Sequence, residues 1–270
     1  MSEQRQTGAL VTRQDLDGVA VLTLSDPRSI NALSEAMLAA LQEALDQIGS
    51  DRSVRAVILR GEGDHFCAGH NLKEMTAARA GEDGGFQYFQ DLFETCSRMM
   101  QTIVTLPQVV IAEVSGIATA AGCQLVASCD LAVASEEARF ATSGVNIGLF
   151  CSTPMVALSR NVARKHAMEM LVLGDFIPAA RAAEMGLVNR VVPRPDLAAT
   201  TMDLAHRIAG KSPAAVRMGK RAFYQQAEMP LAEAYGFAGR VMAENMMARD
   251  AEAGIGAFVS KAPMPDWTGD

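Results

Sequence analysis

Short apolar runs alternate with segments of helical periodicity through the first half of the chain, and this alternation restricts the fold more than any other feature. Val54–Leu59, Val109–Val114 and Leu131–Ala134 are rich in β-branched or small apolar residues, as is typical of strands buried on both faces. Long helical patterns separate them, the clearest at Phe86–Leu106, which Pro107 ends. This order predicts an α/β fold with covered sheets.

The chain begins with a predicted β-hairpin and a capped helix. The hairpin strands are Val11–Gln14 and Val19–Leu24, and the turn Asp15–Gly18 between them contains Asp-Gly. Ser34 is a predicted N-cap, because apolar residues follow it at helical spacing. Those residues are Met37, Leu38, Leu41, Leu45 and Ile48.

The pattern changes after about Ser152. Thr153 and Pro154 predict a helix start, with threonine as the N-cap and proline at the first helical position. Residues 195–270 read as helices broken at Ser212-Pro213, Pro230 and Gly254. We therefore predict two parts, a mixed α/β core over residues 1–194 and a helical oligomerisation module over residues 195–270.

Composition and charge exclude several classes of protein. The chain has 270 residues, 49% of them hydrophobic and 20% charged, which excludes a disordered chain. The formal net charge is −7 and no block of Lys or Arg occurs, so no nucleic-acid partner is expected. No apolar run approaches the roughly 20 residues of a membrane span, and the start of the chain is polar, so neither a membrane anchor nor a secretory signal is predicted.

The five cysteines carry no recognisable pattern. Their number is odd, no Cys-x-x-Cys pair occurs, and the histidine spacing forms no zinc motif. We therefore expect no metal and a soluble protein in a reducing compartment, the cytoplasm.

Two segments have the composition of a site. The first is Phe66–Met75, and the second runs from Pro107–Gly116 into Ala120–Leu125. In both, small residues precede a predicted helix N-terminus, where backbone N–H groups have no intrahelical acceptor. Either segment alone can be explained as a tight packing turn. Two such N–H groups converging on one point would form an oxyanion hole.

Together these segments resemble the signatures of the crotonase superfamily, the enoyl-CoA hydratase/isomerase family. Residues 66–75 and 107–130 fit the family's two motifs, and the likeness extends from Asp26-Pro27 to Ala257–Val259. The resemblance implies a crotonase-like spiral core of ββα units with a helical C-terminal trimerisation module. It also implies acyl-CoA thioesters as substrates, no permanently bound cofactor, and a homotrimer or a dimer of trimers.

The resemblance also assigns roles to individual residues. The backbone N–H groups of His70 and Ala121 would form the oxyanion hole for a thioester enolate. Phe258 and Lys261 would reach the nucleotide end of the ligand bound to a neighbouring subunit. The complete set expected to bind coenzyme A is Arg28, Ile30, Ala68, His70, Leu72, Lys73, Phe258 and Lys261.

The sequence departs from the family at the two positions where a hydratase carries glutamates. Gln124 and Gly144 stand there instead, and neither can exchange a proton near neutral pH. Ordinary enoyl-CoA hydration is therefore not expected, although an enzyme of the hydratase/isomerase type remains the leading hypothesis. Replacing both residues by glutamate should raise hydration if the geometry is retained. The alternative is a non-catalytic acyl-CoA-binding or scaffolding protein.

Three further observations bear on the missing acids. Glu113 lies in an apolar strand, where burial would raise its pKa, but a structural carboxylate pointing away from the site is the favoured interpretation. Cys67 and Cys123 flank the two loops and are interpreted as packing residues. The stretch Gly148–Pro154 resembles the enoyl-CoA hydratase domain-containing proteins, a subgroup without an established reaction.

Overall fold

The computed structural model describes residues 8–270, and two sheets organise its core. The larger sheet pairs its first two strands antiparallel and all the others parallel. Its strands, in spatial order, are β1 (Val11–Leu16), β2 (Val19–Leu24), β3 (Ala56–Gly61), β4 (Val109–Val114), β6 (Leu131–Ser135) and β9 (Arg190–Val192). The smaller sheet contains β5 (Ile117–Thr119), β7 (Arg139–Ala141) and β8 (Ile177–Pro178).

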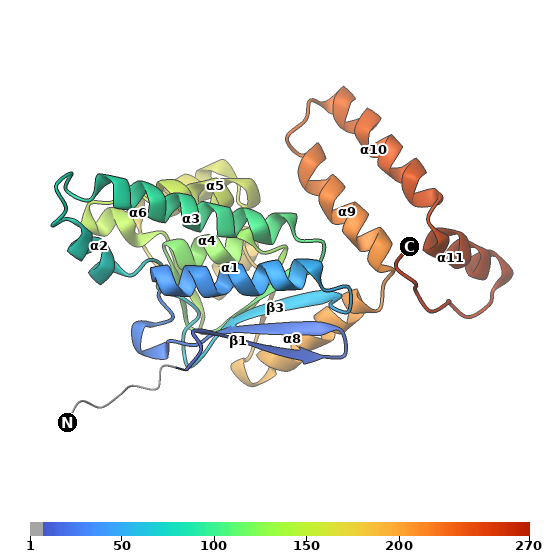
Figure 1. Cartoon of the computed structure of the whole chain (residues 1–270), viewed down its shortest axis with the longest axis horizontal. Coiled ribbons are helices and arrows are strands. Elements are labelled where there is room, and N and C mark those ends of the chain that lie inside the picture. Colours follow the sequence, from blue (N-terminus) through green and yellow to red (C-terminus); the bar gives the residue numbers. More distant parts are fainter. Residues whose placement is uncertain (1–7) are drawn as a thin grey trace.

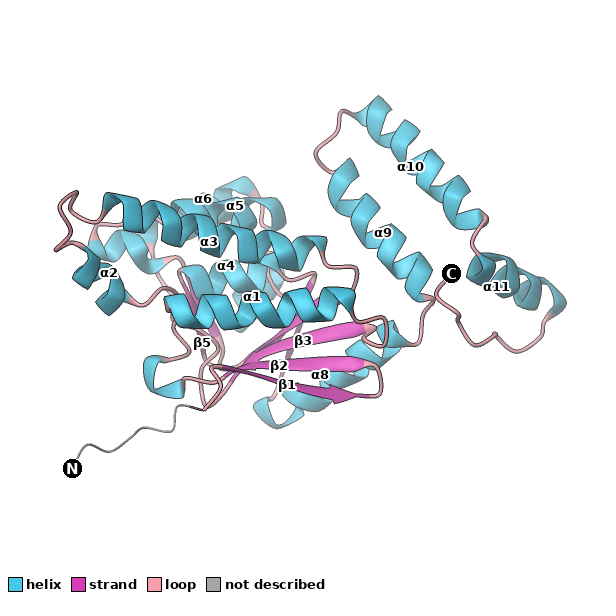
Figure 2. Cartoon of the chain, viewed as in Figure 1, coloured by secondary structure: helices cyan, strands magenta, loops and turns pink. Residues whose placement is uncertain are grey.

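Helices connect the strands and form the C-terminal part (Figure 2). Those up to the last strand of the large sheet are α1 (Glu35–Ser50), α2 (Leu72–Ala78), α3 (Phe86–Thr105), α4 (Ala121–Ser128), α5 (Ser152–Asn161), α6 (Arg164–Leu173) and α7 (Ala179–Glu184), with 3₁₀ turns η1 (Pro27–Ser29) and η2 (Ser143–Ile147). The remaining helices are α8 (Arg194–Ala209), α9 (Pro213–Gln226), α10 (Leu231–Met246) and α11 (Arg249–Ser260).

The large sheet is covered on both faces, which explains its apolar strands. Alternate residues of one strand face opposite sides, so Leu22 packs towards α1 while Val21 packs towards α8. Figure 1 shows α1 and α3 above the sheet and α8 below it. Leu197 and Ala205 of α8 are buried with the sheet residues of that face. Helix α8 therefore packs on the core, although it begins at Arg194, one residue before the predicted C-terminal module starts. The division of the chain into a core and an oligomerisation module remains a prediction.

Helices α9, α10 and α11 lie away from the sheet (Figure 1). Their surface carries large exposed apolar side chains, including Leu231, Tyr235, Met247 and Phe258. Exposed apolar area of this extent on one part of a chain is typical of a surface that contacts another molecule. No helix among residues 8–270 has the length and apolar character needed to cross a membrane.

A buried polar joint ties α9 to the core. The Lys220 ammonium donates to the carbonyl oxygens of Ile103, at 2.9 Å, and Gln108, at 2.8 Å. It also donates to Asp130 Oδ2 at 2.7 Å, and the Tyr224 hydroxyl donates to Asp130 Oδ1 at 2.9 Å. Burial lowers the pKa of Lys220, and the adjacent Asp130 carboxylate opposes that shift. This joint determines where α9 leaves the core.

Most predicted elements are present, but several predicted boundaries are wrong. Strand β1 continues to Leu16, through half of the predicted turn, and β3 covers Ala56–Gly61 where Val54–Leu59 was predicted. Helix α5 begins at Ser152 with Cys151 as N-cap, so Thr153 and Pro154 lie one and two residues inside the first turn. Gly254 does not break a helix, because α11 continues through it and the chain turns at Met247 instead. The three strands of the smaller sheet were not predicted, since strands of two or three residues produce no measurable alternation.

Candidate functional site

A cavity of about 770 Å³ opens at the carboxyl edge of the large sheet, where α/β proteins commonly bind ligands. Its walls come from η1, from the segments that follow β3 and β5, and from the turn between η2 and α5. Met75 and Phe93 contribute apolar surface that we did not predict. The amphipathic pattern of α3 was the available signal for Phe93.

The segments containing His70 and Ala121 meet at this cavity. The Thr119 N–H donates to the Cys67 carbonyl at 3.0 Å, and Cys67 and Ala118 form a parallel bridge. A Cβ added to Gly69 would lie 3.0 Å from the Ala121 nitrogen. Within residues 8–270 the amide N–H groups of His70 and Ala121 have no hydrogen-bond acceptor, while both residues line the cavity.

Left-handed backbone precedes each of these two amides. Gly69 has φ +88°, which glycine adopts without steric cost. Ala120 has φ 50° and ψ −118°, a combination that is costly for a residue with a Cβ. Ala120 is the N-cap of α4, and the Ala121 N–H that follows it has no backbone acceptor among residues 8–270.

The His70 ring lines the same cavity. It packs edge-on against Phe93 with ring centroids 5.5 Å apart. Neither ring nitrogen has a hydrogen-bond partner within the described chain. Burial lowers the pKa of His70, and the Leu33 carbonyl partly opposes that shift. The ring is therefore neutral near pH 7, with one nitrogen a donor and the other an acceptor.

The two positions that lack glutamates differ in their surroundings. Gln124 is 5% exposed, does not line the cavity, and has no partner for Oε1 among the described residues. Gly144 lines the cavity, and its carbonyl accepts from the Leu149 N–H at 2.9 Å. A Cβ at residue 144 would overlap the Leu149 carbonyl oxygen and lie 2.9 Å from Cys151 Sγ. The geometry cannot be retained when glutamate replaces Gly144, so the condition for restored hydration is not met.

The residues expected to bind coenzyme A fall into two groups. Five of them line the cavity together with His70, namely Arg28, Ile30, Ala68, Leu72 and Lys73. Phe258 and Lys261 do not line it. Phe258 is 76% exposed near the end of α11, and Lys261 is the C-cap of that helix. Within one copy of the chain, only the first group belongs to the site.

The other candidate acid lies elsewhere. Glu113 is buried on the α8 side of the sheet and does not line the cavity. Burial raises its pKa, and the Arg60 guanidinium 3.9 Å away opposes the shift. Its interpretation as a carboxylate pointing away from the site is confirmed.

The two cysteines that flank the loops are packing residues. Cys67 and Cys123 are buried in the core, and burial raises the pKa of both thiols to about 12. They are therefore protonated near neutral pH and unsuited to nucleophilic attack.

Comparison with known proteins identifies the family. A family profile described as enoyl-CoA hydratase/isomerase matches residues 14–270. The chain belongs to the enoyl-CoA hydratase/isomerase family. Human enoyl-CoA hydratase domain-containing protein 3, mitochondrial, is 45% identical over 99% of this chain and 85% of that protein. Both the crotonase-like fold and the likeness to this subgroup are thereby confirmed.

Solved structures of family members superpose closely on the chain. The crystal structure of an enoyl-CoA hydratase from Mycobacterium smegmatis is 53% identical, with a TM-score of 0.91 over 96% of this chain and 98% of that one. The crystal structure of human enoyl-CoA hydratase domain-containing protein 3 is 44% identical, with a TM-score of 0.90 over 96% of this chain and 100% of that one. The family supports an enzyme of the hydratase/isomerase type.

One sequence-based prediction is contradicted by these relatives. The similar proteins from Xenopus laevis, human and mouse are all named as mitochondrial, which contradicts the predicted cytoplasmic location. The inference failed because unpaired cysteines indicate a reducing environment and do not distinguish one reducing compartment from another.

Proposed function

We propose that the chain binds acyl-CoA thioesters in the 770 Å³ cavity, with the thioester carbonyl between the N–H groups of His70 and Ala121. The observation that supports this most directly is that two amides with no acceptor in the described part of the chain border one cavity. An oxygen that accepts both hydrogen bonds gains most when it carries negative charge, as in an enolate. One such donor is typically worth about 3–4 kcal/mol in the transition state.

Ordinary hydration is not part of this proposal. Gln124 can orient a water molecule but cannot take its proton, and Gly144 has no side chain. General acid–base groups each contribute about 10²–10⁴-fold, so their absence leaves enolate stabilisation as the chemistry that this site supports. We therefore propose a reaction of the family that passes through a thioester enolate.

The nucleotide end of the ligand is assigned to cations at the cavity mouth. Arg28 and Lys73 line the cavity and would meet the phosphates. Phe258 and Lys261 would come from a neighbouring copy, consistent with the exposed apolar surface of α10 and α11. The proposal thus includes a homotrimer or a dimer of trimers, with acyl-CoA as substrate and no permanently bound cofactor.

The decisive experiment removes one amide donor. Ala121→Pro deletes the N–H at the first position of α4, where proline is compatible with helix geometry. Turnover of an acyl-CoA panel should fall by about 10²–10³-fold, while the affinity for coenzyme A changes little. Arg164→Pro makes the same change at the first position of α6 and is the matched control. Unchanged turnover in Ala121→Pro would refute the oxyanion assignment.

A non-catalytic acyl-CoA-binding protein is the second candidate. The overlap that excludes a side chain at residue 144 favours it, because no acid can occupy that position. Calorimetric titration with the same acyl-CoA panel, followed by product analysis, separates the two. Binding without any product supports the second candidate, whereas rapid hydration of crotonyl-CoA contradicts both.

A further inference from the structure

A second cavity, of about 410 Å³, lies at the opposite edge of the large sheet. Its walls include Arg55, immediately before β3, and Gln108, immediately before β4. Lys211 of the α8–α9 connection and Pro213, the first residue of α9, line it from the other side. It shares no lining residue with the acyl-CoA cavity, because the two cavities lie at opposite ends of the same parallel strands. We call it the basic cavity.

Positive charge is concentrated in the basic cavity, although the whole chain has a net charge of −7. Four cations line it, namely Arg52, Arg55, Lys211 and Arg217. None of them forms an ion pair with a carboxylate of residues 8–270. Uncompensated cations that converge on one concave site attract anions, and arginine in particular suits phosphate.

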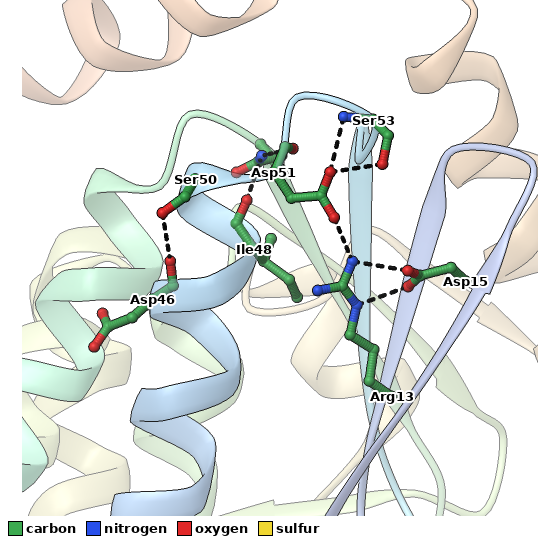
Figure 3. Close-up of polar contacts among 8 residues, drawn as sticks. Arg13, Asp15, Asp46, Ile48, Ser50, Asp51 and Ser53 are labelled. Carbon is green, nitrogen blue, oxygen red and sulfur yellow. Dashed lines mark hydrogen bonds and ion pairs between the residues drawn. The ribbon is translucent and has the colours of Figure 1, made fainter.

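Among residues 8–270, Asp51 is the one carboxylate that lines the basic cavity, and it already has hydrogen-bond partners. Arg13 Nη2 donates to Asp51 Oδ2 at 2.7 Å, and the Ser53 hydroxyl donates to Asp51 Oδ1 at 2.6 Å, as Figure 3 shows. The Ser53 backbone N–H adds a third hydrogen bond at 3.0 Å. The Ser53 hydroxyl and Arg13 lower the pKa of Asp51 to about 2. Asp51 is therefore paired towards β1 and does not neutralise the four cations.

One further group, the Gln108 side chain, lines the basic cavity without a complete set of partners. The N-terminal end of α9 does not add to the charge of the cavity, because its N-cap Ser212 accepts from the Ala215 N–H at 3.2 Å and donates to the buried Asp250 at 2.6 Å. Gln108 Nε2 is held by the carbonyls of Ile48 at 2.9 Å and Asp51 at 3.3 Å. Its Oε1 has no partner in the described chain, and the residue is 6% exposed. That oxygen requires a donor such as a ligand hydroxyl.

We propose that the basic cavity binds a small metabolite that carries a diphosphate group and at least one hydroxyl, such as a nucleoside diphosphate. The phosphates contact Arg52 and Arg55 of the core and Lys211 and Arg217 of the C-terminal part, and a hydroxyl donates to Gln108 Oε1. The ligand thereby bridges the core and the start of α9. This site is independent of the acyl-CoA cavity, so either proposal can fail without the other.

The test is calorimetric titration of the full chain with adenosine diphosphate, inorganic pyrophosphate and sulfate. The double variant Arg52→Gln, Lys211→Gln removes one cation from each side of the cavity. Adenosine diphosphate should bind the unaltered chain, and the double variant should bind it about 100-fold more weakly, since each charged contact contributes about tenfold. Pyrophosphate should lose affinity in the same variant, whereas sulfate should bind more weakly than either.

A matched control removes two exposed cations elsewhere. Arg79→Gln, Lys165→Gln gives the same change in net charge and should leave binding within about twofold, because the remaining long-range attraction is screened by salt. Equal weakening in both double variants would mean non-specific attraction and would overturn the proposal, as would an absence of heat with the unaltered chain. Light scattering identifies another occupant. If Arg52→Gln, Lys211→Gln reduces the size of the assembly and no diphosphate binds, the cations face carboxylates of a second copy, and the proposal is wrong.

Discussion

The proposed acyl-CoA cavity and the Lys220 joint differ in how far their buried polar groups are hydrogen-bonded. At the joint, the ammonium of Lys220 has three acceptors and both carboxylate oxygens of Asp130 are hydrogen-bonded. At the cavity, the amides of His70 and Ala121 and both ring nitrogens of His70 have no partner among the described residues. Unsatisfied buried groups are costly, so a chain retains them where a ligand supplies the missing hydrogen bonds.

The two regions also differ in backbone conformation. The strained Ala120 and the left-handed Gly69 flank the two free amides. Lys220 lies within α9 and Asp130 lies immediately before β6, and neither has a positive φ. The joint therefore combines ordinary backbone with complete hydrogen bonding, whereas the cavity combines positive φ angles with amides that have no acceptor among residues 8–270.

The largest effect expected is on stability, at the joint. Lys220→Met removes the cationic partner of Asp130 and the ammonium that donates to two carbonyl oxygens, so the free energy of unfolding should fall by about 3–5 kcal/mol. Denaturant unfolding measures this. Lys165→Met, at an exposed position, should change it by less than about 0.5 kcal/mol. Similar values for both variants would remove the distinction between the two regions.

A smaller effect is expected where the two loops of the cavity meet. Gly69→Ala combines φ +88° with a Cβ that lies 3.0 Å from Ala121 N and Ala120 Cβ, so stability should fall by about 1–3 kcal/mol and acyl-CoA affinity should fall too. Gly84→Ala is the matched control, since Gly84 has φ +67° but no atom within 4 Å of the added Cβ. We expect it to lose some stability and to keep its affinity. Loss of affinity in both variants would show that the cavity does not depend on close approach of these loops.

The smallest effect concerns pH and the His70 ring. Burial lowers the pKa of His70 from 6.5, so the folded protein binds fewer protons than the unfolded chain below that pH. The stability from the neutral ring is fully present above pH 6.5 and is lost as the pH falls through the folded-state pKa. The free energy of unfolding, measured from pH 7.5 down to pH 5, should therefore decline less steeply in His70→Phe. A slope that matches the unaltered chain would contradict this, and His206→Gln is the control for removal of an exposed histidine.

The local features of the site could be read from the sequence. The small residues around His70 and Ala121, the helix starts that follow them, and the lack of acids at Gln124 and Gly144 are all properties of contiguous segments. Helical and strand periodicities predicted most elements for the same reason, because they depend on residues that are close in the chain.

Other features could not be read because they depend on how the chain packs in three dimensions. The overlap that a side chain at Gly144 would make involves a carbonyl five residues away whose position is determined by the turn into α5. The basic cavity collects its four cations from the loop before β3 and from the start of α9, segments separated by more than 150 residues in the sequence. No sequence pattern links such positions.

The sequence by itself therefore determined the α/β class, the family and the two loops that supply free amides, because short-range periodicity and motif spacing encode them. Only the tertiary structure decided which polar groups are paired, that residue 144 has no room for an acid, and that four cations share a second cavity. Hydrogen bonding and steric exclusion act over a few ångströms in space, and the distance along the chain does not predict which atoms come that close.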